Sequence, residues 1–358
     1  MSETKLNVGI IGIGFWALTR HAPRLQTIPD AELVAIARRN PEALADAKQA
    51  LGGEVQAYTD WRQLLDHPGL DAVIGSTPHH VRAQPTLAAL DRGLHVLVEK
   101  PMALESEDAW AMVEAAEEAD RVLMVGYNMR CAGPWRAAAQ ALKDGALGTV
   151  RQISMVAHTN FRWIWDLEDI PEDFHKMFGV PESFLGETME GYWRRDPTKM
   201  GGGEFADSGS HFVDLALWLG GAPANEVMAL GASAGLPVET HLGIQAHLAN
   251  DVLVSLSCAD GVPAGPHQLT VHGDLGTMTA EQAEMHGKPE ITFHTTEGRE
   301  KLNVDIADTT PTAAFVDTVL RGAPNLSPPR GAAHAVAFSE AVYRSTAEQR
   351  IVKVQSAQ

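Results

Sequence analysis

The chain has 358 residues, which suggests two domains at roughly 150 residues per domain. Apolar residues make up 45% of it and charged residues 21%, which is ordinary globular usage and excludes the disordered and fibrous classes. Its formal net charge is −18, from 46 acidic and 28 basic residues, which argues against general binding to nucleic acid or anionic membranes.

Cysteine content and apolar run length restrict the compartment. The only cysteines are Cys131 and Cys258, so the chain has neither a disulfide framework nor a cysteine-based zinc site. The apolar run at 8–18 is interrupted by glycines and lacks a basic leader, which favours a strand and turn over a signal peptide. No stretch approaches the ~20 apolar residues of a membrane span. We therefore expect a soluble, cytoplasmic protein.

The first 130 residues alternate between apolar strands and helices. Predicted strands lie at 6–13, 33–37, 71–75, 94–98 and 122–125. Helical patterns lie between them at 15–25, from 41 onward, at about 80–92 and at 105–119. Continuous apolar strands separated by helices are typical of a parallel sheet covered on both faces. We therefore predict a doubly wound Rossmann domain over residues 1–130.

The pattern changes after about residue 148. A strand at 150–158 and an irregular stretch at 159–200 precede a helical segment at 201–219. Predicted strands then follow one another at about 225–234, 238–248, 252–259, 267–273 and 276–280, before helices at roughly 310–321 and 330–348. Consecutive strands predict an α+β domain over 131–358 with a large, open, mostly antiparallel sheet. The last helix is placed so that it can pack back on the first domain.

A glycine-rich turn ends the first strand. Gly12, Gly14 and Ala17 form the pattern G-x-G-x-x-A, and Phe15 and Trp16 open the following helix. Such a turn lets a pyrophosphate approach the backbone at a helix N-terminus. A purely structural turn is the alternative, but the position between strand and helix favours dinucleotide binding.

The end of the second strand bears on the choice of dinucleotide. An NAD site usually has an acidic residue there, which holds the ribose 2′-hydroxyl. This chain has Arg38 and Arg39 instead, and a guanidinium suits a 2′-phosphate in charge and geometry. Two solvated arginines are the alternative. NADP(H) is therefore favoured, and NAD(H) remains possible.

Two later strand ends carry further candidates. Thr77-Pro78 follows the third strand and Glu99-Lys100-Pro101 follows the fourth, at the edge where open α/β sheets bind ligands. A lysine there can donate a hydrogen bond to a substrate hydroxyl or a developing alkoxide. An ordinary loop at the end of a strand is the competing interpretation.

The segment 201–214 begins with three glycines and then carries Asp207, His211 and Asp214. On a helix these three side chains lie at i, i+4 and i+7, on one face. A histidine between carboxylates can take a proton from an alcohol near neutral pH. One alternative is a buried histidine whose ring nitrogens are hydrogen-bonded within the fold. The other is a metal site with two ligands from this helix. The sequence has no second cluster of metal-ligating residues to complete such a site, so we predict no metal.

Aromatic residues concentrate in the irregular segment 158–195, which holds eight of the 22 in the chain: Phe161, Trp163, Trp165, Phe174, Phe178, Phe184, Tyr192 and Trp193. Aromatic faces suit the C–H faces of a sugar ring, and Arg162, Arg194 and Arg195 are able to bind hydroxyls or an anionic group. The equally favoured alternative is that these aromatics anchor a long loop.

Taken in order, the motifs resemble those of the Gfo/Idh/MocA oxidoreductase family over essentially the whole chain. They are G-x-G-x-x-A, T-P, E-K-P, G-x-N-x-R at 126–130, W-R-x-D-P at 193–197 and G-G-G-x-x-x-D-x-G-x-H-x-x-D at 201–214. The resemblance implies a Rossmann domain followed by an α/β domain whose open sheet often forms dimers or tetramers. It also implies oxidation or reduction of a sugar or polyol carbon with a nicotinamide cofactor.

By position in these motifs, Lys100, Asp207 and His211 match the catalytic residues of the family. The cofactor site is then expected to include Gly12, Gly14, Phe15, Trp16, Arg38, Arg39, Ser76, Thr77, Pro78, His80, Glu99, Lys100, Asn128, Trp193 and Arg194. The substrate site is expected to include Lys100, Arg162, Trp163, Trp165, Arg194, Asp207 and His211. One departure is the sequence of 77–82, T-P-H-H-V-R, where the family commonly has T-P-N-x-x-H.

Three hypotheses about function follow. The first is an NADP(H)-dependent sugar or polyol dehydrogenase or reductase that acts as a homodimer or homotetramer. The second is a glycosidase that oxidises its sugar transiently and shows no net redox change. The third is a non-catalytic sensor of dinucleotide or sugar, which the presence of Lys100, Asp207 and His211 disfavours. We prefer the first hypothesis.

Overall fold

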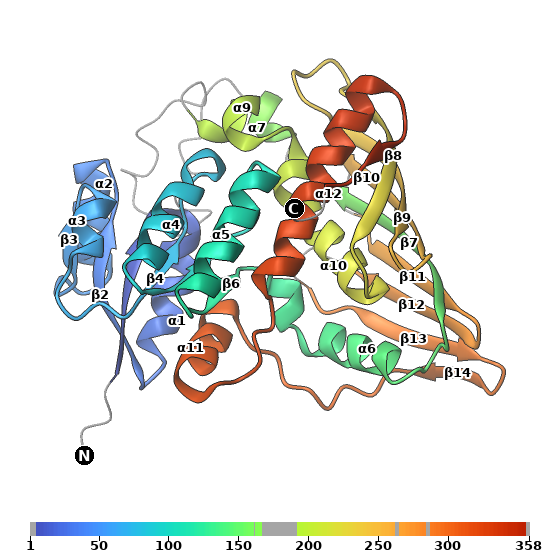
Figure 1. Cartoon of the computed structure of the whole chain (residues 1–358), viewed down its shortest axis with the longest axis horizontal. Helices are drawn as coiled ribbons and strands as arrows, with labels where there is room; N and C mark the ends of the chain where they lie inside the picture. Colours follow the sequence, from blue (N-terminus) through green and yellow to red (C-terminus); the bar gives the residue numbers. More distant parts are fainter. Residues whose placement is uncertain (1–4, 161, 167–191, 262–264, 284–286, 356–358) are drawn as a thin grey trace.

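The computed structural model describes residues 5–160, 162–166, 192–261, 265–283 and 287–355. Two β-sheets lie side by side in it, each with helices packed against it (Figure 1). The fold predicted from the sequence, a doubly wound parallel sheet followed by a mostly antiparallel one, is confirmed.

The first sheet has six strands in the order β3-β2-β1-β4-β5-β6, and all neighbours are parallel. The strands are β1 (Leu6–Ile11), β2 (Ala31–Ala37), β3 (Gln56–Tyr58), β4 (Ala72–Gly75), β5 (His95–Val98) and β6 (Leu123–Val125). The sequence predicted five of these and missed β3. Its three residues are exposed or half-buried at the sheet edge, so they lack the apolar run that identified the others.

Helices cover the first sheet: α1 (Ala22–Gln26), α2 (Pro41–Ala50), α3 (Trp61–Leu65), α4 (Ala83–Asp91) and α5 (Ser106–Glu118). Local sequence defines their starts. Asn40, for example, accepts a hydrogen bond from the Ala43 amide and so caps α2, with Pro41 as its first residue. Strand residues such as Val8, Ile10 and Ile74 are fully buried, as a sheet covered on both faces requires.

The second sheet has nine strands in the order β14-β13-β12-β11-β7-β10-β9-β8-β15. They are β7 (Val150–Thr159), β8 (Ala224–Ala232), β9 (His241–Leu248), β10 (Leu253–Asp260), β11 (His267–Gly273), β12 (Gly276–Gln282), β13 (Glu290–Thr295), β14 (Gly298–Lys301) and β15 (Val352–Lys353). Within this second sheet, β7 and β10 form the one parallel pair among the described strands, and the other pairs are antiparallel. The sequence missed β13, β14 and β15, of which the last two are short and lie at the two edges of the sheet.

One face of the second sheet packs against α6 (Gly133–Lys143), α10 (Ser210–Gly220) and α12 (Pro329–Glu348), as Figure 1 shows. Buried and exposed residues alternate along β9. The face of the second sheet opposite these helices is therefore uncovered within the described chain. Large apolar side chains lie exposed on three strands of this sheet: Val156, Leu230 and Leu253.

The C-terminal helices also contribute to the first domain. α11 (Pro311–Arg321) buries Phe315 and Val316 in the apolar cluster that contains β1, and α12 places Ala332 and Val336 against the cluster that contains α5. α12 therefore lies between the two halves of the molecule (Figure 1). The predicted boundary at residue 130 remains a prediction.

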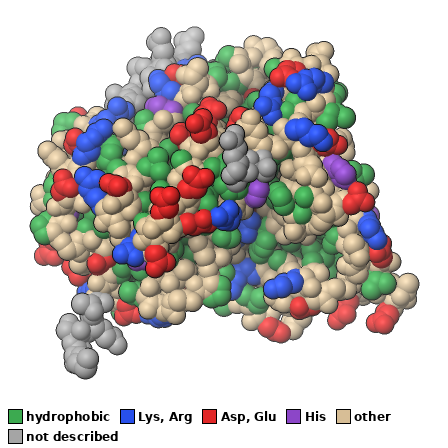
Figure 2. Space-filling view, viewed as in Figure 1, with side chains coloured by type: hydrophobic (Ala, Val, Ile, Leu, Met, Phe, Trp, Pro, Cys, Tyr) green, Lys and Arg blue, Asp and Glu red, His purple; other side chains and the backbone are tan. Residues whose placement is uncertain are grey.

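Acidic and basic side chains are interspersed over the face seen in Figure 2, without a continuous basic patch there. No helix among the described residues combines the length and the apolar character that crossing a membrane would need.

Candidate active site

The glycine turn after β1 has a conformation that only glycine fits. Gly12 has φ +86°, and a Cβ on it would lie 2.7 Å from the Ser76 carbonyl oxygen and 2.9 Å from the Thr77 nitrogen. The turn therefore packs directly on the loop that follows β4, and helical structure begins at Phe15. A bare backbone at the start of a helix is what a pyrophosphate site needs, and binding of a pyrophosphate here stays a prediction.

Arg38 lies beside this turn. Its Nη1 donates to the Ile13 carbonyl at 3.1 Å and would lie 3.7 Å from a Cβ on Gly14. Arg39, the next residue, is exposed. A guanidinium therefore stands next to the turn, at the end of β2, where a ribose substituent of a bound dinucleotide would be expected.

Glu99 is the centre of a buried hydrogen-bond network. Its Oε1 accepts from Trp16 Nε1 at 3.0 Å and pairs with His21 Nε2 at 2.9 Å, and its Oε2 accepts from the Lys100 amide at 3.2 Å. Thr312 of α11 contacts the other ring nitrogen of His21 at 2.8 Å. Burial alone would raise the pKa of Glu99, but the hydrogen bond and the charge of His21 bring the pKa below its ordinary value.

This network ties the helix after the glycine turn to the loop that carries Lys100. Glu99 and Trp16 were predicted to contact the cofactor, and the structure gives both an internal partner. His21 was not singled out from the sequence. The one indication in the sequence was a histidine within a mostly apolar helical stretch, and the structure shows that this side chain is only 2% exposed.

Lys100 and Asp207 meet at the carboxyl edge of the parallel sheet. Lys100 Nζ lies 2.5 Å from Asp207 Oδ1, and Arg194 Nε donates to Oδ2 at 3.0 Å. Burial would raise the pKa of Asp207, but Lys100 and then Arg194 hold that pKa well below its usual range. Lys100, Arg194 and Asp207 thus form one charged cluster, although each was predicted from a different motif and the first and last are 107 positions apart in the chain.

The helix that carries Asp207 is not a regular α-helix there. Phe205–Gly209 form a π-helical turn, and the α-helix α10 begins only at Ser210. A π turn has more residues per turn than an α-helix, so the predicted common face of Asp207, His211 and Asp214 does not follow from their spacing. Such irregular turns often occur at functional sites.

His211 and Asp214 are buried in α10. The His211 ring packs edge-on against Tyr127, with 5.8 Å between ring centroids, and the residue is 4% exposed. Asp214 pairs with Arg130: Nε lies 2.7 Å from Oδ2, and Nη2 lies 2.9 Å from Oδ1. The carboxylate at position 214 is therefore part of a structural ion pair, and it fixes α10 against the turn at 128–131.

The departure from the family pattern at 77–82 adds two buried groups to the site. Arg82 donates to the Thr77 carbonyl at 2.6 Å and to the Pro101 carbonyl, so it joins the two loops. His79 lies 3.8 Å from Asp207 through Nε2 and 2.9 Å from the Met200 carbonyl through Nδ1. His80, the predicted cofactor contact, is exposed, and burial followed by Lys199 lowers its pKa.

The predicted aromatic wall is only partly described. Trp193 packs against His79 with ring centroids 4.7 Å apart, and the Arg194 guanidinium lies 4.3 Å from the centroid of the Trp193 ring. Trp165 is 9% exposed and belongs to a small apolar cluster with Met200, so it supports the anchoring alternative. The side chain of Trp163, and all of Phe161, Phe174, Phe178 and Phe184, lie outside the described residues.

Two further predicted contacts have clear positions. Asn128 is half-buried at the start of the short turn after β6, at the same edge of the parallel sheet as Lys100. Arg162 lies against Gly261, where a Cβ would come 2.7 Å from its Cδ. Arg162 is thus placed beside the end of β10, in the second domain.

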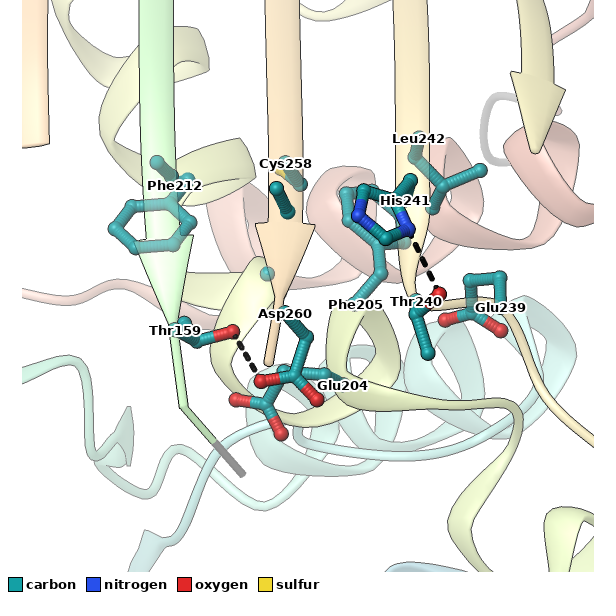
Figure 3. A pocket seen from close by; sticks show the side chains of 13 residues that line it. Thr159, Glu204, Phe205, Phe212, Glu239, Thr240, His241, Leu242, Cys258 and Asp260 are labelled. Atoms are coloured by element: carbon teal, nitrogen blue, oxygen red, sulfur yellow. Dashed lines mark hydrogen bonds between the residues drawn. The ribbon is translucent and has the colours of Figure 1, made fainter. Parts of the chain in front are cut away.

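A small cavity lies behind the π-helical turn, between it and the ends of β7, β9 and β10 (Figure 3). Its volume is about 20 Å³, room for a single water molecule. Glu204 and Asp260 approach each other at one end of it, and Thr159 donates to Asp260 at 3.0 Å. Burial, and then the charge of Asp207, raises the pKa of Glu204 well above its usual range. The cavity is too small for a sugar.

Neither cysteine fits a nucleophilic role. Burial, then Glu204 and Glu239, raises the pKa of Cys258 to about 12, and burial raises that of Cys131 to about 12. A thiol with such a pKa is inert at neutral pH. Within the described segments, no set of three His, Cys, Asp or Glu side chains is arranged to hold a metal ion.

Comparison with known proteins gives two family matches. Residues 6–127 match an oxidoreductase family with an NAD-binding Rossmann fold, and residues 135–279 match the GFO/IDH/MocA C-terminal domain.

Three curated relatives are similar in sequence. A 1,5-anhydro-D-fructose reductase of Ensifer adhaerens is 31% identical over 72% of this chain and 71% of its own length. A levoglucosan dehydrogenase of Pseudarthrobacter phenanthrenivorans is 31% identical over 60% of this chain. A myo-inositol 2-dehydrogenase of Thermotoga maritima is 27% identical over 63%. The matches span only 51% and 58% of the latter two relatives' own lengths.

Solved structures resemble the whole chain. An aldose-aldose oxidoreductase from Caulobacter crescentus, complexed with glycerol, has a TM-score of 0.78 at 23% identity over 98% of this chain and 99% of its own. The WlbA dehydrogenase from Bordetella pertussis, in complex with NADH and UDP-GlcNAcA, has a TM-score of 0.78 at 22% identity over 100% of both chains. At these identities the likeness establishes the fold.

Proposed function

The chain belongs to the Gfo/Idh/MocA family of oxidoreductases, and on this premise we propose that it transfers a hydride between a nicotinamide dinucleotide and a hydroxyl-bearing carbon of a sugar or polyol. The observation that carries the proposal is the Lys100–Asp207 contact of 2.5 Å. It places an ammonium group at the carboxyl edge of the parallel sheet, the same edge that carries the glycine turn, where a reacting oxygen needs a donor. The names of the sequence relatives support a sugar or polyol substrate.

Each residue of the site has a separate role in the proposed reaction. When bound, the nicotinamide ring supplies or accepts the hydride. Lys100 donates a hydrogen bond to the reacting oxygen and stabilises the charge that develops on it. Before the substrate binds, Asp207 holds Lys100 at this position, and Arg194 holds Asp207 from its other oxygen. His211 exchanges the hydroxyl proton as general acid and base, with its ring packed against Tyr127.

The dinucleotide is proposed to lie along the carboxyl edge of the first sheet. The bare backbone at Gly12 and Gly14 would hold its pyrophosphate, and the loop at 76–80 and Asn128 would contact its nicotinamide half. This arrangement rests on the close approach of Gly12 to Ser76, which leaves no room for a side chain between the two loops.

We propose NADP(H) as the preferred dinucleotide. The support is Arg38 beside the glycine turn, at the end of β2, with exposed Arg39 next to it. A guanidinium can bind a 2′-phosphate with two charge-assisted hydrogen bonds, each worth about 1.5–3 kcal/mol. We therefore expect kcat/KM to favour NADP⁺ over NAD⁺ by about ten- to a hundredfold.

The test of this preference compares both dinucleotides in the wild type, in Arg38→Asp and in the control Arg24→Asp, whose side chain lies on α1. Arg38→Asp should reverse the preference, because a carboxylate repels the 2′-phosphate and accepts from a free 2′-hydroxyl. Equal wild-type values, or an Arg38→Asp variant that still prefers NADP⁺, would contradict the assignment.

The activity itself is tested by a screen of sugars and polyols with each oxidised dinucleotide, followed through the absorbance of the reduced nicotinamide. Steady formation of reduced cofactor with at least one substrate supports the dehydrogenase. Cleavage of a glycoside without net reduction would instead identify the redox-neutral glycosidase. Binding of sugar or dinucleotide without turnover would identify a sensor.

The quaternary structure is a further expectation. Val156, Leu230 and Leu253 are exposed on strands of the second sheet, and the face that its helices leave uncovered suits the surface of a second copy. We propose a homodimer or homotetramer formed through this sheet. The test is the molar mass in solution, measured by light scattering for the wild type and for Leu253→Lys. The substitution places a charge on the uncovered face and should lower that molar mass. Cytoplasmic localisation remains a prediction.

A further inference from the structure

His79 reaches the Lys100–Asp207 pair from the first domain. It opens a short turn (η2, His79–Val81) after β4, and its side chain is 1% exposed. Nδ1 lies 2.9 Å from the Met200 carbonyl oxygen and Nε2 lies 3.8 Å from Asp207 Oδ1. Because a carbonyl oxygen only accepts, the hydrogen-bonded Nδ1 carries a hydrogen. A neutral ring then presents the lone pair of Nε2 to the carboxylate.

Asp207 Oδ1 therefore has two nitrogen neighbours of different kinds. Lys100 Nζ lies 2.5 Å away and donates, whereas His79 Nε2 lies 3.8 Å away and, in the neutral ring, has no hydrogen to donate. A proton on Nε2 would turn this contact from repulsive to attractive. The second carboxylate oxygen is already held by Arg194, so the competition concerns Oδ1 alone.

The surrounding charges indicate which state prevails at rest. Burial, then the charge of Arg82, lowers the pKa of His79 well below its usual value, and Arg194 acts in the same direction. Asp207 and the bond to Met200 oppose them. At neutral pH the His79 ring is therefore expected to be neutral, with its hydrogen on Nδ1.

We propose that Lys100 and His79 share Asp207 Oδ1, and that His79 is a positioning residue that donates Nε2–H to this oxygen whenever Lys100 does not. In turnover, Lys100 must serve the reacting oxygen, and His79 then keeps Asp207 in place. That role in turnover rests on the proposed function, whereas the sharing of Oδ1 does not. The proton on His79 comes from solvent and returns to it, so the redox balance is unchanged.

The proposed competition of Lys100 and His79 for Asp207 Oδ1 is tested on the protein without cofactor or substrate. Long-range ¹H–¹⁵N spectra of the apo protein, labelled at histidine, report which ring nitrogens carry hydrogen, and His79→Asn identifies the His79 signals. We expect a neutral ring with hydrogen on Nδ1 at pH 7. In Lys100→Met the titration midpoint of His79 should rise by at least about one pH unit, since a competing cation is removed from the same oxygen.

Two comparisons make this result decisive. Lys100→Gln removes the same charge while it keeps a polar side chain, and it covers the case in which Lys100→Met does not fold. Lys48→Met, on the outer helix α2, removes a lysine charge away from the site. A midpoint that moves no further in the Lys100 variants than in Lys48→Met would overturn the proposal. So would a ring without hydrogen on Nδ1.

The role in turnover is tested with two substitutions at position 79. Asn can keep the donor to Met200 but has no group at Nε2, whereas Gln can place an amide N–H near Nε2. We expect His79→Asn to lower kcat by about ten- to a hundredfold with little change in KM. It should also remove the basic limb of the kcat–pH profile, because the Nε2–H donor is lost when His79 gives up its proton. His79→Gln should recover most of kcat.

If both variants retain the wild-type kcat and pH profile, His79 does not position Asp207. A wild-type protein that reduces no dinucleotide with any sugar or polyol would instead contradict the proposed function. The spectroscopic result on the apo protein stands apart from that outcome, so the two failures are distinguishable.

Discussion

The buried pair of Arg130 and Asp214 connects the fold to the site, and its removal should be costly. Both side chains are nearly inaccessible, at 8% and 2% exposure, and hydrogen bonds of 2.7, 2.9 and 3.0 Å join them. Asp214→Asn keeps the shape but leaves the guanidinium without its counter-charge inside the protein. Breaking such a pair costs about 3–5 kcal/mol. Because the amide oxygen can still accept one bond, we expect the lower end, about 3 kcal/mol.

The assay is urea unfolding followed by circular dichroism. With an m-value of about 3 kcal/mol per molar, the midpoint should fall by about 1 M. The exposed pair Arg151–Asp274 provides the matched control, and Asp274→Asn should leave the midpoint nearly unchanged. The double substitution Arg130→Met with Asp214→Leu should recover much of the loss, because no unpaired charge remains buried. A shift in Asp214→Asn no larger than in Asp274→Asn would refute the reasoning.

Four further outcomes are expected. The pKa of Glu99 is lower in the folded protein than its unfolded value of about 4.3, so the ionised carboxylate stabilises the fold above that pH. Glu99→Gln should therefore lower the thermal unfolding midpoint at pH 7. The gap between the midpoints of the wild type and the variant should shrink as the pH falls below about 4. His211→Ala should lower kcat by about 10²–10⁴-fold without weakening dinucleotide binding, and an unchanged turnover number would remove it from the mechanism. Lys100→Met should lower kcat/KM on the identified substrate, and full retention would contradict its role. Gly12→Ala should weaken dinucleotide binding measured by calorimetry, because its Cβ would meet the backbone of Ser76; wild-type affinity would count against the proposed pyrophosphate site.

The sequence was informative where function depends on short-range patterns. The glycine turn at 12–14, the strand ends at 77–78 and 99–101, and the alternation of strands and helices are each encoded within a few residues. They predicted the two sheets, which the structure confirms, and they singled out Lys100, which contacts Asp207. The sequence missed the short edge strands β3, β14 and β15, whose residues do not bury enough apolar surface to form a pattern.

Only the tertiary structure decided which charged groups are partners. Asp207 contacts residues 79, 100 and 194, which come from three separate segments, and no local spacing encodes those distances. The π-helical turn at 205–209 likewise cancels the helical periodicity on which the common face of Asp207, His211 and Asp214 depended. Asp214, in the regular helix α10, instead pairs with Arg130 in the interior, where charge must be compensated. Burial and pairing are properties of the packed chain, so the role of each carboxylate is determined only when the two domains come together.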